Sequence, residues 1–412
     1  MTTMQDRWGL PVADGTAGAV AALGDAWLAY GALRTAAGDH LKSCLAETPA
    51  LPLGLLTRAS FLMLFARADF SARVVADMDR VPAHLPPREA MYRDALQYWH
   101  AGRFEAAAAT YSEWLAAHPT DFLGIKLLQY LLFYLGDGQM MATASARTLP
   151  AWTADVPGEA LIHGCHAFDC EEAGDLGRAE RIGRAAVERE PLDLWGTHAV
   201  AHVLEMEGRA AEGIAWLQAC EPNWDGANPF IGHVWWHKAL FHLTLGQLDQ
   251  ALALYDGAVA GGRSDDTLDL ANAISLLWRL QDRGVAIGDR WQALAPIAAK
   301  RAHDQLLPFL DLHLALAFQR AGAVGDLDQL VARLVIQAND NDTAGRVIAA
   351  VGLDMVRGIA ALSHGSVTEA RRLMVSAMRG LSAIGGSYAQ RDVFWQATRA
   401  VGGDTPRQGY RV

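Results

Sequence analysis

Histidine is concentrated in one part of this sequence. Half of the fourteen histidines lie between positions 163 and 242, namely His163, His166, His198, His202, His233, His237 and His242. An imidazole titrates near neutral pH, so it can act as a general acid or base, bind a metal ion or hold a polar ligand. This segment is therefore the first place to look for chemistry.

The spacing of these histidines matches a helix and a repeat. His198 and His202 are four residues apart, as are His233 and His237, so each pair lies on one face of a helix. Glu205 continues the face that carries His202. The interval from His198 to His233 is 35 residues, and His163 precedes His198 by the same interval. We expect these residues on equivalent helices of successive repeats, stacked at roughly 8–10 Å.

We expect acid/base chemistry from four residues and ligand binding from seven others. In a catalytic pocket the imidazoles would exchange protons, with Glu205 or Asp256 holding one tautomer. The candidate catalytic residues are His198, His202, Glu205 and His237. The candidate ligand-binding residues are His163, His166, His233, Trp236, Asp256, Arg279 and Arg391.

Three interpretations of the histidines stay open. They could be structural, each bonded to carbonyls or carboxylates between stacked helices. They could hold a small polar molecule together with Trp236. They could also bind a metal through His198 and His202, completed by Glu205 or His237. The glutamate that follows the first histidine of zinc peptidases is absent, and we predict no bound metal and no cofactor.

Helical periodicity dominates the elements that must position these residues, with breaks at Gly, Pro and Asp. A glycine marks a turn between two helices, a small alanine lets them approach closely, and an aromatic residue fills the groove. This pattern resembles the tetratricopeptide repeat, whose period is about 34 residues. It occurs as Gly102-x4-Ala107-x3-Tyr111, Gly174-x4-Ala179 and Gly246-x4-Ala251-x3-Tyr255.

The predicted fold is all-α, a right-handed superhelix (α-solenoid) of tetratricopeptide-like helical pairs in one continuous array. Residues 86–262 hold the repeats, residues 1–85 a helical flanking or capping segment, and residues 263–412 further helical repeats with a C-terminal cap. In the last segment we expect helices at Leu268–Arg283, Trp291–Arg301, Leu306–Ala321, Asp326–Val335, Thr343–Ser363, Thr368–Ala383 and Ser387–Ala400.

Five segments resemble, in matching order from about Pro86 onward, the tetratricopeptide repeat protein 38 family. They are Thr197-His-Ala-Val-Ala-His-Val-Leu-Glu-Met-Glu-Gly-Arg209, His233-Val-Trp-Trp-His-Lys-Ala-Leu240, Leu254-Tyr-Asp256, Ser275-Leu-Leu-Trp-Arg279 and Gly385-Gly-Ser-Tyr-Ala-Gln-Arg-Asp392. The resemblance implies a helical repeat superhelix, but no activity, cofactor or substrate. It also implies a shared polar set: His198, His202, Glu205, Arg209, His233, Trp236, His237, Asp256, Arg279, Gln390, Arg391 and Asp392.

The last of these segments also has a structural interpretation. Ser387 followed by Gln390 has the spacing of a capping box at the start of a helix. Arg391 then falls in the first helical turn, or it reaches into the concave channel and binds an anion.

Composition narrows the class of protein. The chain of 412 residues carries 35 basic against 46 acidic residues, a net charge of −11, which argues against a broad nucleic-acid surface. Four cysteines without a CxxC pair exclude a disulfide scaffold. The first residues do not predict a signal peptide, and the apolar stretch Leu127–Leu135 is too short to span a membrane. We expect a cytoplasmic protein without nucleic-acid or membrane partners.

Two functions compete for this architecture. The first is binding of a small polar or anionic ligand in a concave channel lined by His, Trp and Arg, with acid/base chemistry there. The alternative is an adaptor that docks a protein or peptide in the concave groove without catalysis. The sequence leaves open whether the protein is an enzyme, and it is compatible with a homodimer.

Overall fold

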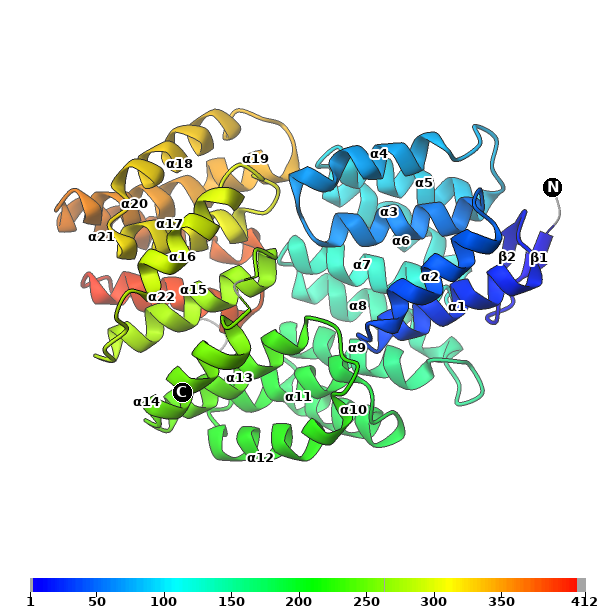
Figure 1. Cartoon of the computed structure of the whole chain (residues 1–412), viewed down its shortest axis with the longest axis horizontal. Helices are drawn as coiled ribbons and strands as arrows, with labels where there is room; N and C mark the ends of the chain where they lie inside the picture. The colour runs from blue at the N-terminus through cyan, green and yellow to red at the C-terminus, as the bar shows by residue number, and fades with distance from the viewer. Residues whose placement is uncertain (1–2, 263, 406–412) are drawn as a thin grey trace. The chain divides into compact units, whose positions relative to one another are not determined.

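The computed structural model describes residues 3–262 and 264–405, and this part of the chain is almost entirely helical. The prediction of an all-α fold is therefore confirmed, with consecutive helices packed as antiparallel neighbours (Figure 1). The handedness of the superhelix stays a prediction. Within the described ranges, no helix is long and apolar enough to cross a bilayer.

The chain folds as two compact units, which are described separately. The first contains the residues up to Phe133 together with Gly138–Val203 and Gln218–Ile231, and the second contains Tyr134–Asp137, Leu204–Leu217 and the described residues from Gly232 onward. The three segments expected from the sequence stay a prediction.

The first unit contains the elements of the N-terminal half of the chain. Short 3-10 helices lie at Ala68–Phe70, Leu149–Ala151 and Glu221–Asn223. The strands and α-helices are β1 (Thr3–Gln5), β2 (Pro11–Ala13), α1 (Ala17–Gly31), α2 (Ala36–Glu47), α3 (Pro52–Leu64), α4 (Ser71–Asp79), α5 (Pro87–His100), α6 (Phe104–Ala117), α7 (Phe122–Tyr134), α8 (Gly138–Thr148), α9 (Glu159–Glu172), α10 (Leu176–Arg189) and the greater part of α11 (Leu194–Met206).

The second unit contains the remaining helices. The chain enters it through α12 (Ala210–Cys220) and α13 (Ile231–Thr244), each of which has residues in both units. Two π-helical segments lie at Tyr255–Val259 and Ile348–Gly352, and a 3-10 segment lies at Leu381–Ile384. The other helices are α14 (Leu248–Leu254), α15 (Thr267–Asp282), α16 (Arg290–Arg301), α17 (Pro308–Ala321), α18 (Val324–Gln337), α19 (Thr343–Val347), α20 (Leu353–Ser363), α21 (Val367–Met378) and α22 (Tyr388–Ala400).

The turn glycines do what the repeat pattern predicts. Each has a positive φ between its two helices, a conformation that glycine adopts without a Cβ clash. The recurring alanine and tyrosine are buried, and Tyr111 of α6 meets Tyr92 of α5 edge to face at 5.6 Å. The glycines concerned are Gly102, Gly136, Gly174, Gly208 and Gly246.

The N-terminus differs from the expected helical flank, because β1 and β2 form a short antiparallel hairpin. Asp6 accepts hydrogen bonds from the backbone N–H groups of Trp8 and Leu10, which fixes the turn. Its carboxylate also pairs with the buried guanidinium of Arg88 at 2.7 Å, and Arg88 pairs with Asp121 at 3.0 Å. These ion pairs attach the hairpin to the helices, a long-range interaction that periodicity does not reveal.

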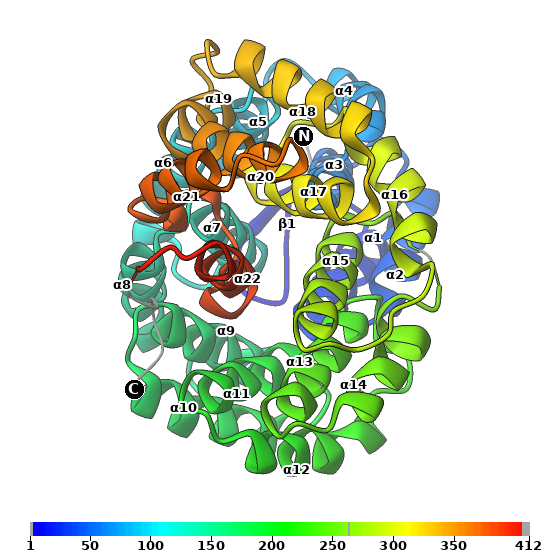
Figure 2. The ribbon, with the colours of Figure 1, turned by 90° about the vertical axis from the view of Figure 1, so that its left-hand side faces the viewer.

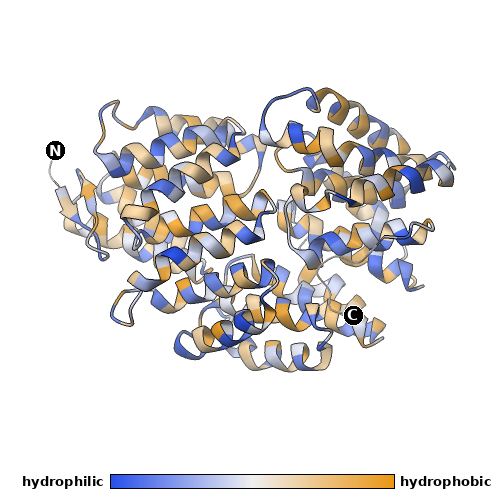
Figure 3. Cartoon of the chain, turned by 180° about the vertical axis from the view of Figure 1, so that it is seen from behind, coloured by the Kyte–Doolittle hydropathy of each residue, from blue (hydrophilic) through white to orange (hydrophobic). Residues whose placement is uncertain are grey.

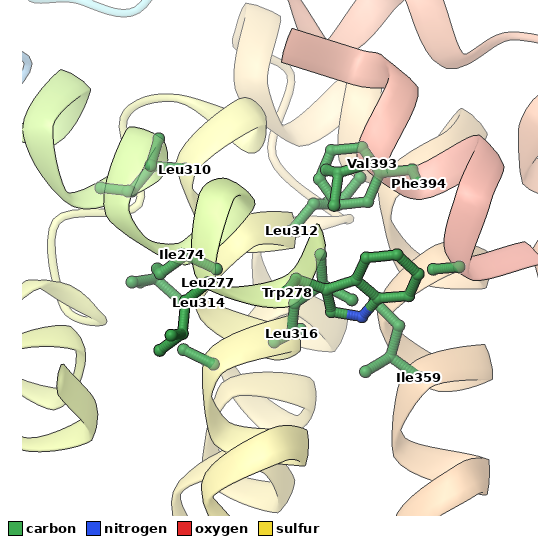
Figure 4. Close-up of a cluster of buried hydrophobic side chains, with 14 of the residues drawn as sticks. Ile274, Leu277, Trp278, Leu310, Leu312, Leu314, Leu316, Ile359, Val393 and Phe394 are labelled. Atoms are coloured by element: carbon green, nitrogen blue, oxygen red, sulfur yellow. The ribbon is translucent and has the colours of Figure 1, made fainter. Parts of the chain in front are cut away.

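The core of the second unit lies where α15, α17, α20 and α22 meet (Figure 4). Trp278 of α15 packs among Leu312 and Leu316 of α17, Ile359 of α20 and Phe394 of α22, all buried. Hydrophobic and hydrophilic residues are interspersed along the helices of the described chain (Figure 3). The capping box of Ser387 and Gln390 is confirmed at the start of α22.

One carboxyl group in this core gives a pH prediction. Burial and the nearby Asp304 together raise the pKa of Asp311 to about 8, against the opposing effect of Arg333. A carboxyl in an unfolded chain has a pKa near 3.9. The folded chain thus binds this proton more tightly, and its stabilising effect is full below about pH 4 and lost as pH rises through about 8.

We therefore expect Asp311→Asn to stabilise the chain increasingly as pH rises from about 5 to about 8, by up to about 1.4 kcal/mol per pH unit. Urea unfolding at four pH values measures the difference from wild type. The control is Asp328→Asn, because Asp328 is exposed beside His364. A difference for Asp311→Asn that does not grow with pH would contradict the account.

Candidate functional site

Three successive helices, α9, α10 and α11, position the candidate site in the first unit, and they lie side by side in both ribbon views (Figures 1 and 2). α9 approaches the start of α11 at a glycine, because a Cβ on Gly164 would lie 3.2 Å from the Cα of Gly196. α10 approaches α11 in the same way, with Gly183 facing Val200. Small residues thus bring the backbones together.

A buried pair of imidazoles lies on α11. The Nε2 atoms of His198 and His202 are 2.8 Å apart, a hydrogen-bonding distance, and both side chains are at most 2% exposed. The i, i+4 spacing predicted that the two rings share a face, and the structure confirms it. One proton lies between the two nitrogens, so one ring donates and the other accepts.

Two glutamates at the end of α9 complete the group. The Oε2 of Glu171 is 3.4 Å from the Nδ1 of His202, and both side chains are fully buried. One ligand atom from each of Glu171, Glu172 and His202 lies within 4.8 Å of the others. We call His198, His202, Glu171 and Glu172 the imidazole–carboxylate cluster.

Burial sets the protonation of this cluster. It lowers the pKa of His202 to about 4, because the charged ring loses water, while the nearby Glu172 acts in the opposite direction. His202 is therefore neutral at pH 7. Oε2 of Glu171 faces Nδ1 of His202, and a proton on that Nδ1 would leave Nε2 of His202 to accept from Nε2–H of His198.

Aromatic rings surround the imidazoles. The ring of His198 lies 5.3 Å from Phe168, 5.4 Å from Trp195 and 5.0 Å from Phe230, measured between centroids. Phe168 also meets His202 edge on at 5.3 Å. These apolar walls keep the local dielectric low and strengthen the polar contacts inside.

Two other predicted residues of the first unit lie apart from this cluster. His163 is partly exposed and its Nδ1 lies 3.0 Å from the carboxylate of Glu159. His166 is buried between Ser145, at 2.7 Å from Nδ1, and Cys170, at 3.4 Å from Nε2. Burial lowers the pKa of His166 to about 4. The partner of His163 lies on its own helix, whereas the partners of His166 are a hydroxyl and a thiol.

In the second unit, a further group of predicted residues comes together on α13 and α15. The ring of His233 stacks on Trp236 at 5.1 Å and meets His237 at 4.7 Å, while its Nδ1 bonds Asn272 at 3.0 Å. The guanidinium of Arg279 lies 5.7 Å from the centre of the Trp236 ring. It also donates to the carbonyl of Ala389 at 3.0 Å.

The last three predicted residues have different surroundings. Asp256 is exposed and forms an ion pair with Arg290 at 2.7 Å, at a cavity of about 210 Å³ in the second unit. Arg391 is buried and donates to the carbonyls of Gly385 and Gly386, so it holds the turn before α22. Glu205 is half-buried on α11, three residues after His202.

Sequence reasoning missed Glu171 and Glu172. A signal was present, because Glu171 stands three residues before the turn glycine Gly174, as Glu205 stands three residues before Gly208. The repeat therefore places a glutamate at the same helix position twice, and the first copy is the one that reaches His202.

A comparison with models of known protein families finds none that matches this chain.

The approach of α9 to α11 gives a stability prediction. A Cβ at Gly164 would lie 2.1 Å from the buried carboxylate of Asp193, which accepts from the backbone N–H of Gly196. We expect Gly164→Ala to destabilise the chain by about 1–3 kcal/mol, through overpacking. The measurement is the midpoint of urea unfolding followed by circular dichroism.

The matched control for this substitution is Gly177→Ala on α10, where an added Cβ meets nothing within 4 Å. This variant should be more stable than wild type by roughly 0.5–1 kcal/mol, because alanine favours the helix. Equal effects of the two substitutions would contradict a close contact between α9 and α11.

Proposed function

We propose that this protein binds a small polar ligand beside the imidazole–carboxylate cluster and that the His198–His202 pair exchanges a proton with that ligand. The proposal extends the function predicted from the sequence, and it moves the emphasis to Glu171 and Glu172 as members of the site. It rests on side chains of the first unit.

The observation that carries the proposal is the ordered contact of three buried groups. The carboxylate of Glu171 is 3.4 Å from Nδ1 of His202, and the Nε2 of His202 is 2.8 Å from the Nε2 of His198. With the proton of His202 on Nδ1, His198 carries its proton on Nε2 and its basic nitrogen is Nδ1. An acid that orients one imidazole, which in turn polarises a second, is an arrangement that supports proton transfer.

The surroundings support a small ligand over a peptide. His198 and His202 are buried, and the rings nearest to them are Phe168, Trp195 and Phe230. A peptide-binding adaptor presents its specificity residues on an open surface, whereas a small ligand is largely enclosed. The peptide alternative would use other, exposed side chains.

We also propose that the chain is a member of the tetratricopeptide repeat protein 38 family. The order and spacing of the five segments named above support this proposal, together with the paired helices that carry them. Family membership implies no particular reaction, so the proposed function rests on the cluster alone.

The proposed function predicts that the binding of polar ligands depends on the side chain of His198. Chelator-treated wild-type protein is screened against small polar and anionic compounds by thermal shift, and dissociation constants are measured for compounds that raise the unfolding temperature. We expect His198→Gln to raise the dissociation constants of these compounds at least tenfold, because glutamine offers no titratable nitrogen.

The control is His166→Gln, which replaces a buried histidine of the same unit outside the cluster. It should leave the same affinities within about twofold, a difference of roughly 0.4 kcal/mol. The proposal fails if no polar compound raises the unfolding temperature, or if both variants retain the affinities of wild type.

A further inference from the structure

We infer that Glu171, Glu172 and His202 form a binding site for a divalent transition-metal ion. The inference deepens the proposed function, on which its location rests, by naming a class of ligand for the same cluster. It differs from the metal interpretation left open by the sequence, which relied on His198, Glu205 and His237 instead of the two glutamates of α9.

The first support is the geometry of the ligand atoms. One atom from each of the three side chains lies within 4.8 Å of the others, and the side chains are 1%, 7% and 0% exposed for Glu171, Glu172 and His202. Ligands that surround a zinc ion at about 2.0–2.2 Å are themselves roughly 3–4 Å apart. A contraction of about 1 Å, within the reach of glutamate side-chain rotation, would close the site.

The second support is the kind of ligand. Two carboxylates and one imidazole combine hard oxygen donors with a borderline nitrogen, a set that suits Zn²⁺ or Mn²⁺. Mg²⁺ and Ca²⁺ prefer oxygen ligands throughout. The two negative charges also equal the charge of a divalent ion, so binding would leave the buried site neutral.

The third support is the residue behind the ligand. A histidine that binds a metal through one nitrogen generally donates a hydrogen bond from the other, which fixes the ring. His202 has that arrangement, because its Nδ1 faces Glu171 and its Nε2 lies 2.8 Å from His198. His198 is thus a positioning residue for the metal site.

Metal binding would reverse the proton order in the imidazole pair. The ion takes the place of the proton on Nδ1 of His202, and that ring then carries its proton on Nε2 and donates it to Nε2 of His198. The proton of His198 moves to Nδ1, so the pair holds two protons before and after binding. His198 then presents a hydrogen-bond donor at Nδ1, whereas in the metal-free pair the same atom is an acceptor. The metal-bound chain would therefore bind a different class of polar compound at His198 than the metal-free chain does.

The experiment is calorimetric titration of the chelator-treated full chain with Zn²⁺ in the presence of excess Mg²⁺. We expect one Zn²⁺ per chain in wild type, a loss of at least tenfold in affinity for Glu172→Gln, and a loss of 10–100-fold for His198→Gln. Glu188→Gln, an exposed glutamate on α10, is the matched control and should bind as wild type does.

A second readout is the visible d–d absorption of bound Co²⁺, which reports nitrogen and oxygen ligands directly and should change in Glu172→Gln. Should that variant not fold, judged by circular dichroism without metal, Glu171→Gln takes its place. The absence of stoichiometric Zn²⁺ binding, full competition by Mg²⁺, or unchanged affinity in the glutamate variants would each overturn the inference.

The two proposals fail separately. If polar ligands bind the metal-free chain through His198 while Zn²⁺ does not bind, the proposed function stands and the metal site is wrong. If Zn²⁺ binds through Glu172 while the binding of polar ligands does not depend on His198, the metal site is supported and the proposed function is wrong.

Discussion

Burial of polar groups is the constraint on which the site depends. His202 is fully buried, and an imidazole in that position is costly unless both of its nitrogens meet polar partners. Glu171 lies on one side of the ring and His198 on the other. In the proposed arrangement, each group therefore influences the protonation of the next.

The helical pairs supply the positions for this unit. Glu171 and Glu172 end α9, whereas His198 and His202 lie in the middle turns of α11, so the cluster forms only where those two helices come close. Gly164 permits this approach, because any side chain there would strike the carboxylate of Asp193. Asp193 is buried and bonds the backbone of Gly196 at the start of α11. One glycine and one acid thus set the register of both helices.

The sequence allowed the prediction of features that depend on neighbours along one helix. The i, i+4 spacing placed His198 and His202 together, and the recurring glycines marked the turns between helices. The capping box at Ser387 followed from a spacing of three residues. In each case, a local rule of helix geometry is sufficient.

Features that depend on the rotation of one helix against another could not be predicted. His163 precedes His198 by 35 residues, but the turn glycines Gly174 and Gly208 are 34 apart. One residue rotates a helical side chain by about 100°. His163 therefore meets Glu159 at the edge of α9, and it is Glu171 that reaches His202. The role of the two buried glutamates could be recognised only from the three-dimensional arrangement of the helices.

The central claim is the ordered proton arrangement of Glu171, His202 and His198. Nitrogen-15 NMR of the chelator-treated, histidine-labelled chain at pH 7, with assignments from His198→Gln, tests it directly. The account predicts His202 protonated on Nδ1, His198 protonated on Nε2, and a scalar coupling between the two Nε2 nuclei across their hydrogen bond. Two imidazoles with independent tautomers and no such coupling would contradict it.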